Sequence, residues 1–506
     1  MTRAAFVRLI RFELDTVVRE PATWTIFALL AAALIWGAAN GQRHVRAQEA
    51  AVARIHQREA DAIAWQKTTA HRFMQPTAVT PGAPALRTPT VPYWQDPTDV
   101  AGYMRYGLTS FAVKPPSVFG ALAIGQSNVV PFYLRARLDF ISPPEAAYEF
   151  ENPRGLGTGP FDLAFVCVDL LPLAVILLTA WRLSAERDSG ALRVIASQPA
   201  TGHAIVASKF GAVAIVAIPM ILIATWLALA LAGVPMVRPR LLAIEAIVAL
   251  AIAGYAAFWI ALGASIAPRL GAVASTSTLA ALWIVLVFVV PAIDALALAT
   301  LHPTPSRLRY LDALRSESDI TDKRRDDLIR QYLAVRPAYR AGTHRIAAIP
   351  YATKQIAVQT ELERRMRDRA AAFDAARVGA GRAAAALRLL SPALVLDYVL
   401  QVAAGSDAAR QESFLARARE HTDRLRQFFW PRALREAAHP TAQVCHGCPA
   451  QMNFMEYDDI PRFVEDNPLI GIVRRIVPMA LYLWIAVAAL AFVACRASDL
   501  GALRAD

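Results

Sequence analysis

Six long apolar runs restrict the fold of this chain more than any other feature. They lie at 21–40, 161–182, 204–231, 241–266, 271–300 and 472–495. Three of them fall within residues 204–300. Each is near the roughly 20 residues that an α-helix needs to cross a hydrocarbon core about 30 Å thick. The chain is 56% hydrophobic and only 19% charged, whereas soluble domains are about a quarter charged. The sequence therefore predicts an α-helical integral membrane protein with six transmembrane helices.

Two large inserts separate these runs. The first, 41–160, begins with a polar helical stretch at 42–69 and continues into a proline-rich, irregular segment at 75–116. The second, 301–471, holds charged, alanine-rich stretches at 312–335, 353–390 and 406–428, which prolines separate. We expect both inserts to be mainly helical and extracytoplasmic.

Residues 1–20 predict an amphipathic helix rather than a signal peptide. Phe6, Ile10, Leu14 and Val17 recur at helical spacing among several arginines. A helix of this kind, joined directly to the first span, is typical of one that lies in the membrane interface on the cytoplasmic side. A solvated helix is the alternative.

Arginine placement indicates the topology. Six spans put both ends of the chain, including the tail at 496–506, on one side, and the arginines near the N-terminus and at 182–193 make that side cytoplasmic. Both inserts then lie in the periplasm of a Gram-negative cell, and the spans lie in its inner membrane. Arg238, Arg240, Arg474 and Arg475 run against this rule, although large translocated domains weaken it.

The segment 183–203, between the second and third spans, carries the most specific motif. It reads Glu-Arg-Asp-Ser-Gly-Ala-Leu-Arg-Val-Ile-Ala-Ser-Gln-Pro over 186–199, with Lys209 at the start of the third span. This segment resembles the cytoplasmic segment of type-2 ABC exporter permeases. Further similar residues point to a poorly characterised branch of that family with two soluble inserts: Asn152, Pro153, Gly159, Phe161, Asp162, Leu171, Pro172, Leu173, Ser391, Pro392, Ala404, Gly405, Phe414, Phe428 and Phe429.

The resemblance implies a permease subunit that is not itself an enzyme. The chain has no Gly-x-x-x-x-Gly-Lys-Ser/Thr phosphate loop, so ATP and Mg²⁺ would be bound by a separate ATPase dimer, with no cofactor bound directly. A second permease copy or a sibling permease is also implied. The amphipathic stretch at 192–195 suits a short helix that seats in a cleft of the ATPase; an ordinary charged loop is the alternative. The residues expected to couple are Glu186, Arg187, Asp188, Gly190, Leu192, Gln198 and Pro199.

Two further places could carry chemistry. Asp169 lies within the second span, where a charge is costly and usually faces protein or water; it could line a substrate path, hold a dimer contact or lie near the hydrated surface. Cys445-His446-Gly447-Cys448, in the second insert, could form a local disulfide, hold a soft metal ion such as Cu(I) with His or Met ligands nearby, or act as a redox dithiol.

Three functions fit these observations. The first is export driven by a partner ATPase, and the second is mechanical transmission to a periplasmic client, for example during metal delivery, without transport. The third is a membrane-anchored metal or redox protein centred on Cys445 and Cys448. The net charge of +12 does not indicate nucleic-acid binding, because the arginines are spread over loops and helices instead of forming one basic domain.

Overall fold

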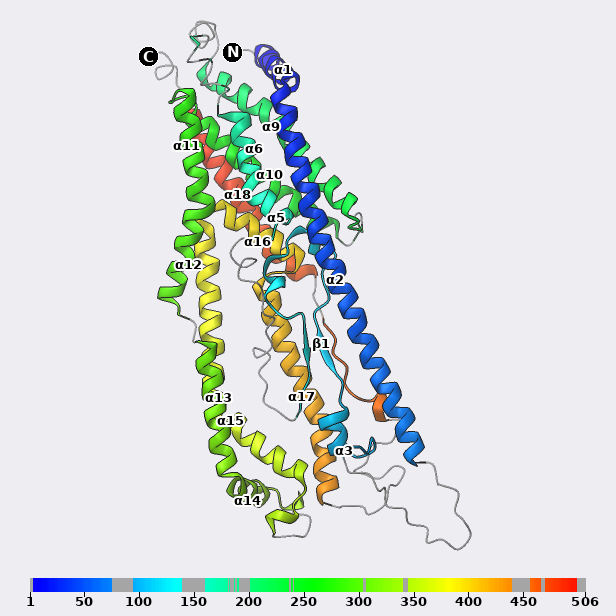
Figure 1. Cartoon of the computed structure of the whole chain (residues 1–506). Helices are drawn as coiled ribbons and strands as arrows, with labels where there is room; N and C mark the ends of the chain where they lie inside the picture. The colour runs from blue at the N-terminus through cyan, green and yellow to red at the C-terminus, as the bar shows by residue number, and fades with distance from the viewer. Residues whose placement is uncertain are drawn as a thin grey trace.

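The computed structural model describes residues 3–74, 94–138, 160–180, 182, 186, 189–190, 201–235, 238–239, 241–303, 306–339, 345–438, 456–465 and 469–497. Within these residues the protein is mostly helical and elongated. The N- and C-terminal ends of the chain lie at the same end of the molecule (Figure 1).

All six apolar runs are helical. Five of the described helices are long and apolar enough to cross a membrane, and a sixth, Leu163–Thr179, is apolar but shorter. The chain is thus a multi-pass membrane protein. The long helices are α2 (Pro21–Met74), α9 (Gly202–Ala232), α10 (Leu242–Ile266), α18 (Leu469–Ala497) and the continuous run of α11 (Ala272–Ile284), η6 (Val285–Val289) and α12 (Val290–Leu301); the shorter one comprises α5 (Leu163–Phe165), η5 (Val166–Leu170) and α6 (Leu171–Thr179).

Helix α2 is much longer than the first predicted span. The apolar run and the polar stretch after it form one helix of 54 residues, which is about 80 Å long at 1.5 Å per residue. That is more than twice the thickness of a hydrocarbon core. The polar half of α2 therefore projects beyond the bundle of apolar helices (Figure 1).

Helix α10 forms the centre of the bundle. Its Tyr255 and Trp259 side chains are fully buried and belong to one large apolar core with residues of α2, α6, α9 and α18. The run α11–η6–α12 is the least buried of the long apolar helices. Its exposed Ile284, Phe288 and Ile293 side chains suit contact with lipid or with another membrane helix.

Helix α16 (Pro392–Ala404) joins this core although it belongs to the predicted second insert. Ser391 caps its N-terminus, and Val395, Leu396, Val399 and Leu400 are fully buried among the bundle residues. Only part of 301–471 therefore lies apart from the bundle.

Much of the rest of the described chain extends away from the bundle (Figure 1). Phe119, Ala121 and Leu122 of the first insert are exceptions, because they belong to the bundle core. The helices predicted in the second insert are confirmed as α13 (Arg307–Lys323), α14 (Arg325–Val335), α15 (Tyr351–Leu387) and α17 (Ala408–Ala438). The first insert adds a small antiparallel sheet, β1 (Phe111–Val113) with β2 (Tyr133–Arg135), which was not predicted. The short helical turns are α3 (Val100–Gly102), η1 (Tyr103–Gly107), η2 (Gly120–Leu122), η3 (Gly125–Asn128), η7 (Pro337–Tyr339), η8 (Ile346–Ala348), η9 (Arg388–Leu390) and η10 (Glu456–Asp458). Of these, η2 lies in the bundle core.

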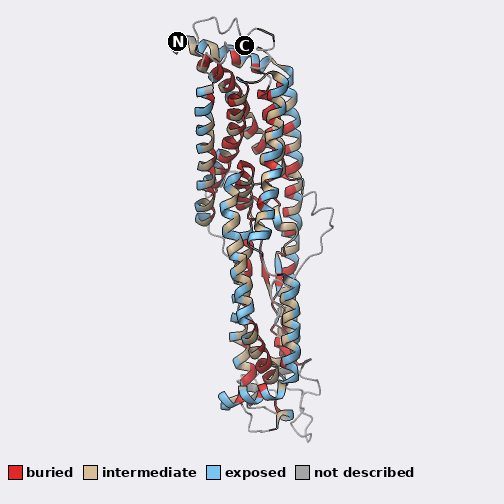
Figure 2. Cartoon of the chain, turned by 90° about the vertical axis from the view of Figure 1, so that its left-hand side faces the viewer, coloured by how far each residue is buried: buried red, intermediate tan, exposed pale blue. Residues whose placement is uncertain are grey.

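A second apolar core closes the far end of the molecule. Tyr103, Phe429 and Tyr457 pack together there, with Leu425 and Ile356 beside them. Buried residues gather in the bundle and again at this far end, whereas the long helices between them are mostly exposed or half-buried (Figure 2). The protein is thus a membrane bundle joined by long helices to a smaller, separate core.

Candidate coupling site

Helix α1 (Arg3–Arg19) presents the predicted apolar face to the bundle. Val17 is buried, and Phe6, Ile10 and Leu14 are half-buried. Val17 is part of the bundle core and Leu14 packs against it. Glu13 falls on the same helical face and is also buried. An acidic residue on an apolar face requires a cationic partner.

Lys209 of α9 is that partner. Its buried ammonium Nζ lies 2.8 Å from Glu13 Oε1 and 2.6 Å from Glu186 Oε1. Lysine carries three N–H donors on one ammonium group, so it can serve two carboxylates at once. A buried charge that loses its partner is strongly destabilising. Lys209 therefore links α1, α9 and the predicted coupling segment, residues 183–203, to one another.

A second ion pair lies beside this triad. Arg182 Nη2 donates to Glu20 Oε2 over 2.7 Å, and Arg182 Nε donates to the Leu178 carbonyl over 2.9 Å. Arg182 follows the helix Leu163–Thr179, and Glu20 lies between α1 and α2. Glu13 and Glu20 of the N-terminal segment therefore pair with Lys209 and Arg182, which lie on either side of the motif at 186–199.

Only two of the predicted coupling residues fall within the described part of the chain. Glu186 joins the triad. Gly190 has a φ of +77°, and no heavy atom of the described residues lies within 4 Å of the position where its Cβ would be. A positive φ favours glycine because other residues are strained there. The others, Arg187, Asp188, Leu192, Gln198 and Pro199, lie outside the described residues.

The roles of Glu13 and Glu20 were missed in the sequence. The signal for Glu13 was present, because it interrupts the apolar face of 1–20 at helical spacing from Ile10 and Val17. Its partner could not be read from the chain, because Lys209 lies 196 residues away.

Asp169 lies in the π-helical segment η5, inside the bundle. Its backbone carbonyl accepts a hydrogen bond of 3.0 Å from Trp283 Nε1. The neighbouring Val168 carbonyl accepts a hydrogen bond of 2.8 Å from the Tyr255 hydroxyl. This carbonyl is available because Pro172, four residues later, has no N–H to donate to it. The backbone around Asp169 is thus anchored to α10 and α11 through its carbonyls.

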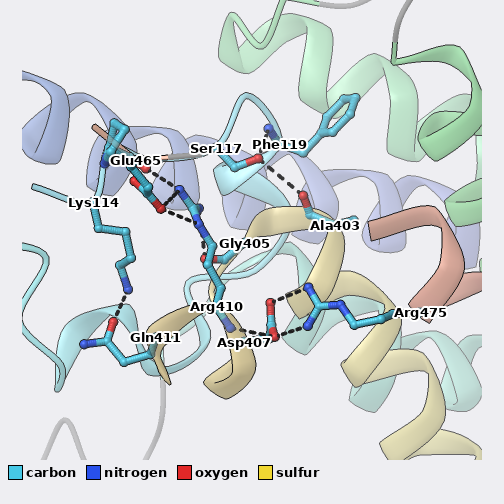
Figure 3. A network of polar contacts seen from close by, with 11 residues as sticks. Lys114, Ser117, Phe119, Ala403, Gly405, Asp407, Arg410, Gln411, Glu465 and Arg475 are labelled. Atoms are coloured by element: carbon cyan, nitrogen blue, oxygen red, sulfur yellow. Dashed lines mark hydrogen bonds and ion pairs between the residues drawn. The ribbon is translucent and has the colours of Figure 1, made fainter. Parts of the chain in front are cut away.

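A polar junction joins the inserts to the last span (Figure 3). Arg410 of α17 donates to the Pro115 carbonyl over 2.7 Å and pairs with Glu465 over 3.2 Å. Asp407 is buried and pairs with Arg475 of α18 over 2.6 Å. Arg475 is one of the two arginines that run against the charge rule at the outer end of the last span. Its ion pair with Asp407 gives it a structural role there.

The same junction contains a buried lysine. Lys114 Nζ donates to Gln411 Oε1, and Gln411 Nε2 donates to the Pro131 carbonyl over 3.2 Å. Burial, together with the nearby Arg410, lowers the pKa of Lys114 to about 8. Burial raises the pKa of Glu465, although the Arg410 guanidinium opposes that shift. The junction thus connects the first insert, α17 and α18 through buried polar groups.

The predicted metal or disulfide motif lies outside the described residues, as Cys445, His446 and Cys448 all do. Of the four cysteines, Cys167 is buried and Cys495 is exposed. In the described part of the chain, no group of three or more His, Cys, Asp or Glu side chains could hold a metal ion.

The comparison with protein families decides the identity. A family profile described as ABC-2 family transporter protein matches residues 7–343, which is more than half of the chain. The chain belongs to this family. The match runs from α1 to the segment after α14, so it includes the Lys209 triad. The resemblance to type-2 ABC permeases is thereby confirmed. Permeases of this family are typically non-catalytic and work with a partner ATPase subunit.

A second profile covers most of the second insert. It is described as a domain of unknown function (DUF3526) and matches residues 307–443, from α13 through α17. No curated protein and no solved structure matches the chain.

Proposed function

We propose that this ABC-2 permease is the membrane subunit of an exporter in the bacterial inner membrane. A separate ATPase dimer would bind the cytoplasmic segment at 183–203 and drive rearrangement of six spans. The tails, α1 and the coupling segment would then be cytoplasmic, and the parts of 41–160 and 301–471 beyond the bundle would be periplasmic. The substrate would leave on the periplasmic side.

The Lys209 triad is the observation that carries this proposal. It links Glu186, in the motif expected to contact the ATPase, to α9 and α1 through contacts of 2.6 and 2.8 Å. A push on the coupling segment would therefore reach two helices at once. No atom of the described residues lies within 4 Å of a Cβ placed at Gly190, which supports a partner surface on this segment.

A second permease copy, or a sibling permease, completes the proposed complex. The exposed apolar face of α11 and α12 supports this part of the proposal, with Ile284, Phe288, Ile293 and Leu296 pointing outward. The same face would serve equally well against lipid, so cross-linking between α12 positions in membranes is the direct measurement.

Coupling is tested with Glu186→Gln and Gly190→Ala in the complex of permease and ATPase. We expect both variants to retain the ATPase subunit and to lose permease-stimulated ATP hydrolysis by about fivefold or more, the size of a typical coupling free energy. Glu361→Gln on α15 is the control, since it removes the pairs of Glu361 with Arg364 and Arg365, far from the segment. Wild-type stimulation in both coupling variants would contradict the proposal.

Export is tested separately with inverted membrane vesicles. Mass spectrometry of the vesicle contents, before and after ATP is added, should reveal a compound that accumulates with the wild-type protein and not with Glu186→Gln. If active complexes accumulate nothing, mechanical transmission becomes the better account. That alternative is favoured by the long helices α2, α13, α15 and α17, which reach far beyond the bundle (Figure 1).

The Cys445–Cys448 pair remains a prediction in either case. As a disulfide or a soft-metal site, it would act in the periplasmic part and not in coupling. Alkylation of the purified protein with and without reductant, read by mass spectrometry, distinguishes a disulfide from free or metal-bound thiols.

A further inference from the structure

A cleft of about 590 Å³ lies beyond the bundle, lined by the projecting half of α2, the strand β1 and the segment 458–465. This volume is within the ordinary range of small-molecule sites. The coupling site lies at the other end of α2, where α1 meets the bundle (Figure 1). The cleft is therefore separate from the proposed coupling site.

Two phenylalanine rings form apolar walls of this cleft. Phe111 packs edge-to-face against Tyr133, with ring centroids 6.3 Å apart, and Phe463 packs in the same way against Phe414 at 6.0 Å. Both rings are only half-buried, so each keeps surface that a ligand can contact. Because their neighbours already hold these rings in place, an aromatic group can pack against them at little cost in side-chain ordering.

Four of the charged groups at the cleft are already paired. Lys67 pairs with Asp458, and both line the cleft. Glu465 also lines it and pairs with Arg410 over 3.2 Å. Each pair is neutral as a unit, so neither requires a charged ligand.

Glu59 is a carboxylate without a strong partner. Among the described residues its one ion-pair neighbour is the exposed His56, whose Nδ1 lies 3.9 Å from Glu59 Oε2. The Phe111 N–H donates to Glu59 Oε1 over 3.4 Å, which is beyond the usual range for a strong N–H···O bond. Burial raises the pKa of Glu59, because the groups around it only partly offset the loss of water. An ammonium group would supply the missing donor.

Arg462 is the matching cation. It is exposed, and within the described part of the chain its guanidinium forms no ion pair or hydrogen bond. Its positive charge counteracts part of the effect of burial on the pKa of Glu59, so the two charges lie near each other. The cleft thus offers one uncommitted charge of each sign beside two aromatic walls.

We propose that this cleft binds an aromatic zwitterion, a small molecule with one ammonium group, one carboxylate and an aromatic body. Glu59 accepts hydrogen bonds from the ammonium group, and Arg462 donates to the carboxylate. The aromatic body packs against Phe111 and Phe463. Aromatic α-amino acids and short peptides of them have this chemistry. This binding is independent of export and of the identity of its substrate.

A set of small ligands tests the three parts of the proposal. Phenylalanine and the dipeptide phenylalanyl-phenylalanine are the probes, and the comparison between them separates a free amino acid from a short peptide. Phenethylamine lacks the carboxylate, 3-phenylpropionate lacks the ammonium group, and glycine lacks the aromatic body. Ligand-observed NMR titration of the full-length protein in lipid nanodiscs should give the better probe a Kd of about 1 mM or tighter. Each analogue should bind about tenfold more weakly.

Two substitutions assign the charges to the ligand. Glu59→Gln should weaken the better probe about tenfold and leave 3-phenylpropionate, which has no ammonium group, unaffected. Arg462→Gln should weaken the same probe and leave phenethylamine unaffected. Glu49→Gln and Arg58→Gln, at exposed positions of α2 outside the cleft, are the matched controls and should leave every affinity unchanged.

The proposal is overturned if neither probe binds within this range. It is equally overturned if glycine binds as tightly as the better probe, or if Glu59→Gln and Arg462→Gln bind that probe as the wild-type protein does.

Discussion

At the scale of single residues, Lys209 has the largest consequences. One ammonium holds two carboxylates from different elements, Glu13 on α1 and Glu186 in the coupling segment, and two of the three side chains are almost fully buried. Without the cation, two negative charges would face each other with little water between them. Loss of one partner of a buried pair is far more costly than absence of the whole pair.

Lys209→Met should therefore destabilise the protein by about 3 kcal/mol. Thermal unfolding of the purified protein in detergent is the measurement. Lys67→Met is the matched control, because the pair of Lys67 with Asp458 is half-exposed and is worth about 1 kcal/mol or less. Adding Glu13→Gln to Lys209→Met should restore part of the loss. Equal effects of the two lysine variants would show that the triad contributes no more than a surface pair.

At the scale of elements, close approaches between backbones position the spans. A Cβ at Gly37 of α2 would lie 2.7 Å from the Asp162 carbonyl oxygen, and one at Gly41 would lie 2.5 Å from that of Ala121. Asn40, between them, donates from Nδ2 to the Phe161 carbonyl over 2.9 Å. Helix α2 thus rests directly on the backbone at the start of the second run and on η2.

Gly41→Ala should destabilise the protein by about 1–3 kcal/mol, because the atom that a methyl group meets is backbone and cannot move aside. Gly379→Ala in α15 is the control, since no heavy atom of the described residues lies within 4 Å of its Cβ position. There alanine should stabilise the helix by up to about 1 kcal/mol. Both changes are measured by thermal unfolding, and a stabilising Gly41→Ala would refute the close approach.

The π-helical segments η5 and η6, both in the bundle, illustrate a second rule at this scale. Each is followed by a proline, Pro172 after η5 and Pro291 after η6, and each has carbonyls that accept side-chain hydrogen bonds. Ser391, which caps α16, donates from its hydroxyl to the Leu286 carbonyl in η6 over 2.6 Å. Proline has no N–H, so each of these prolines leaves a carbonyl of the preceding turn without its helical donor. Neighbouring elements donate hydrogen bonds to these carbonyls instead.

At the scale of the whole molecule, the bundle and the far core are joined by long helices. The junction of Arg410, Asp407 and Arg475 lies where α17 meets α18 (Figure 3). The ion pairs Arg426–Glu363 and Arg419–Asp374 then tie α17 to α15. Movement of the last span has a continuous route of buried and half-buried contacts into the outer helices.

The distance between α2 and α15 should therefore change when the partner ATPase binds ATP. Fluorescent amino acids at Ala53 and Ala372, both exposed, would report it by energy transfer in single complexes. Glu186→Gln should abolish the change by breaking the link to the coupling segment. A distance that stays constant through the ATP cycle would exclude transmission to the outer helices and leave export as the sole consequence of coupling.

The sequence alone determined the features that depend on neighbouring residues. Hydropathy over about 20 residues located six apolar helices, and helical periodicity predicted the inward face of α1. Charged, alanine-rich stretches separated by prolines predicted the helices of the second insert. The motif at 186–199 indicated the ABC-2 permease family. These signals are local, because a hydrophobic run or an amphipathic period is complete within one segment of the chain.

Tertiary structure decided which of these segments meet. The sequence did not indicate that Lys209 would pair with Glu13, that Arg475 would pair with Asp407, or that α16 would join the bundle core. Each of these contacts joins residues that lie far apart along the chain. The local sequence around one side chain does not identify its distant partner.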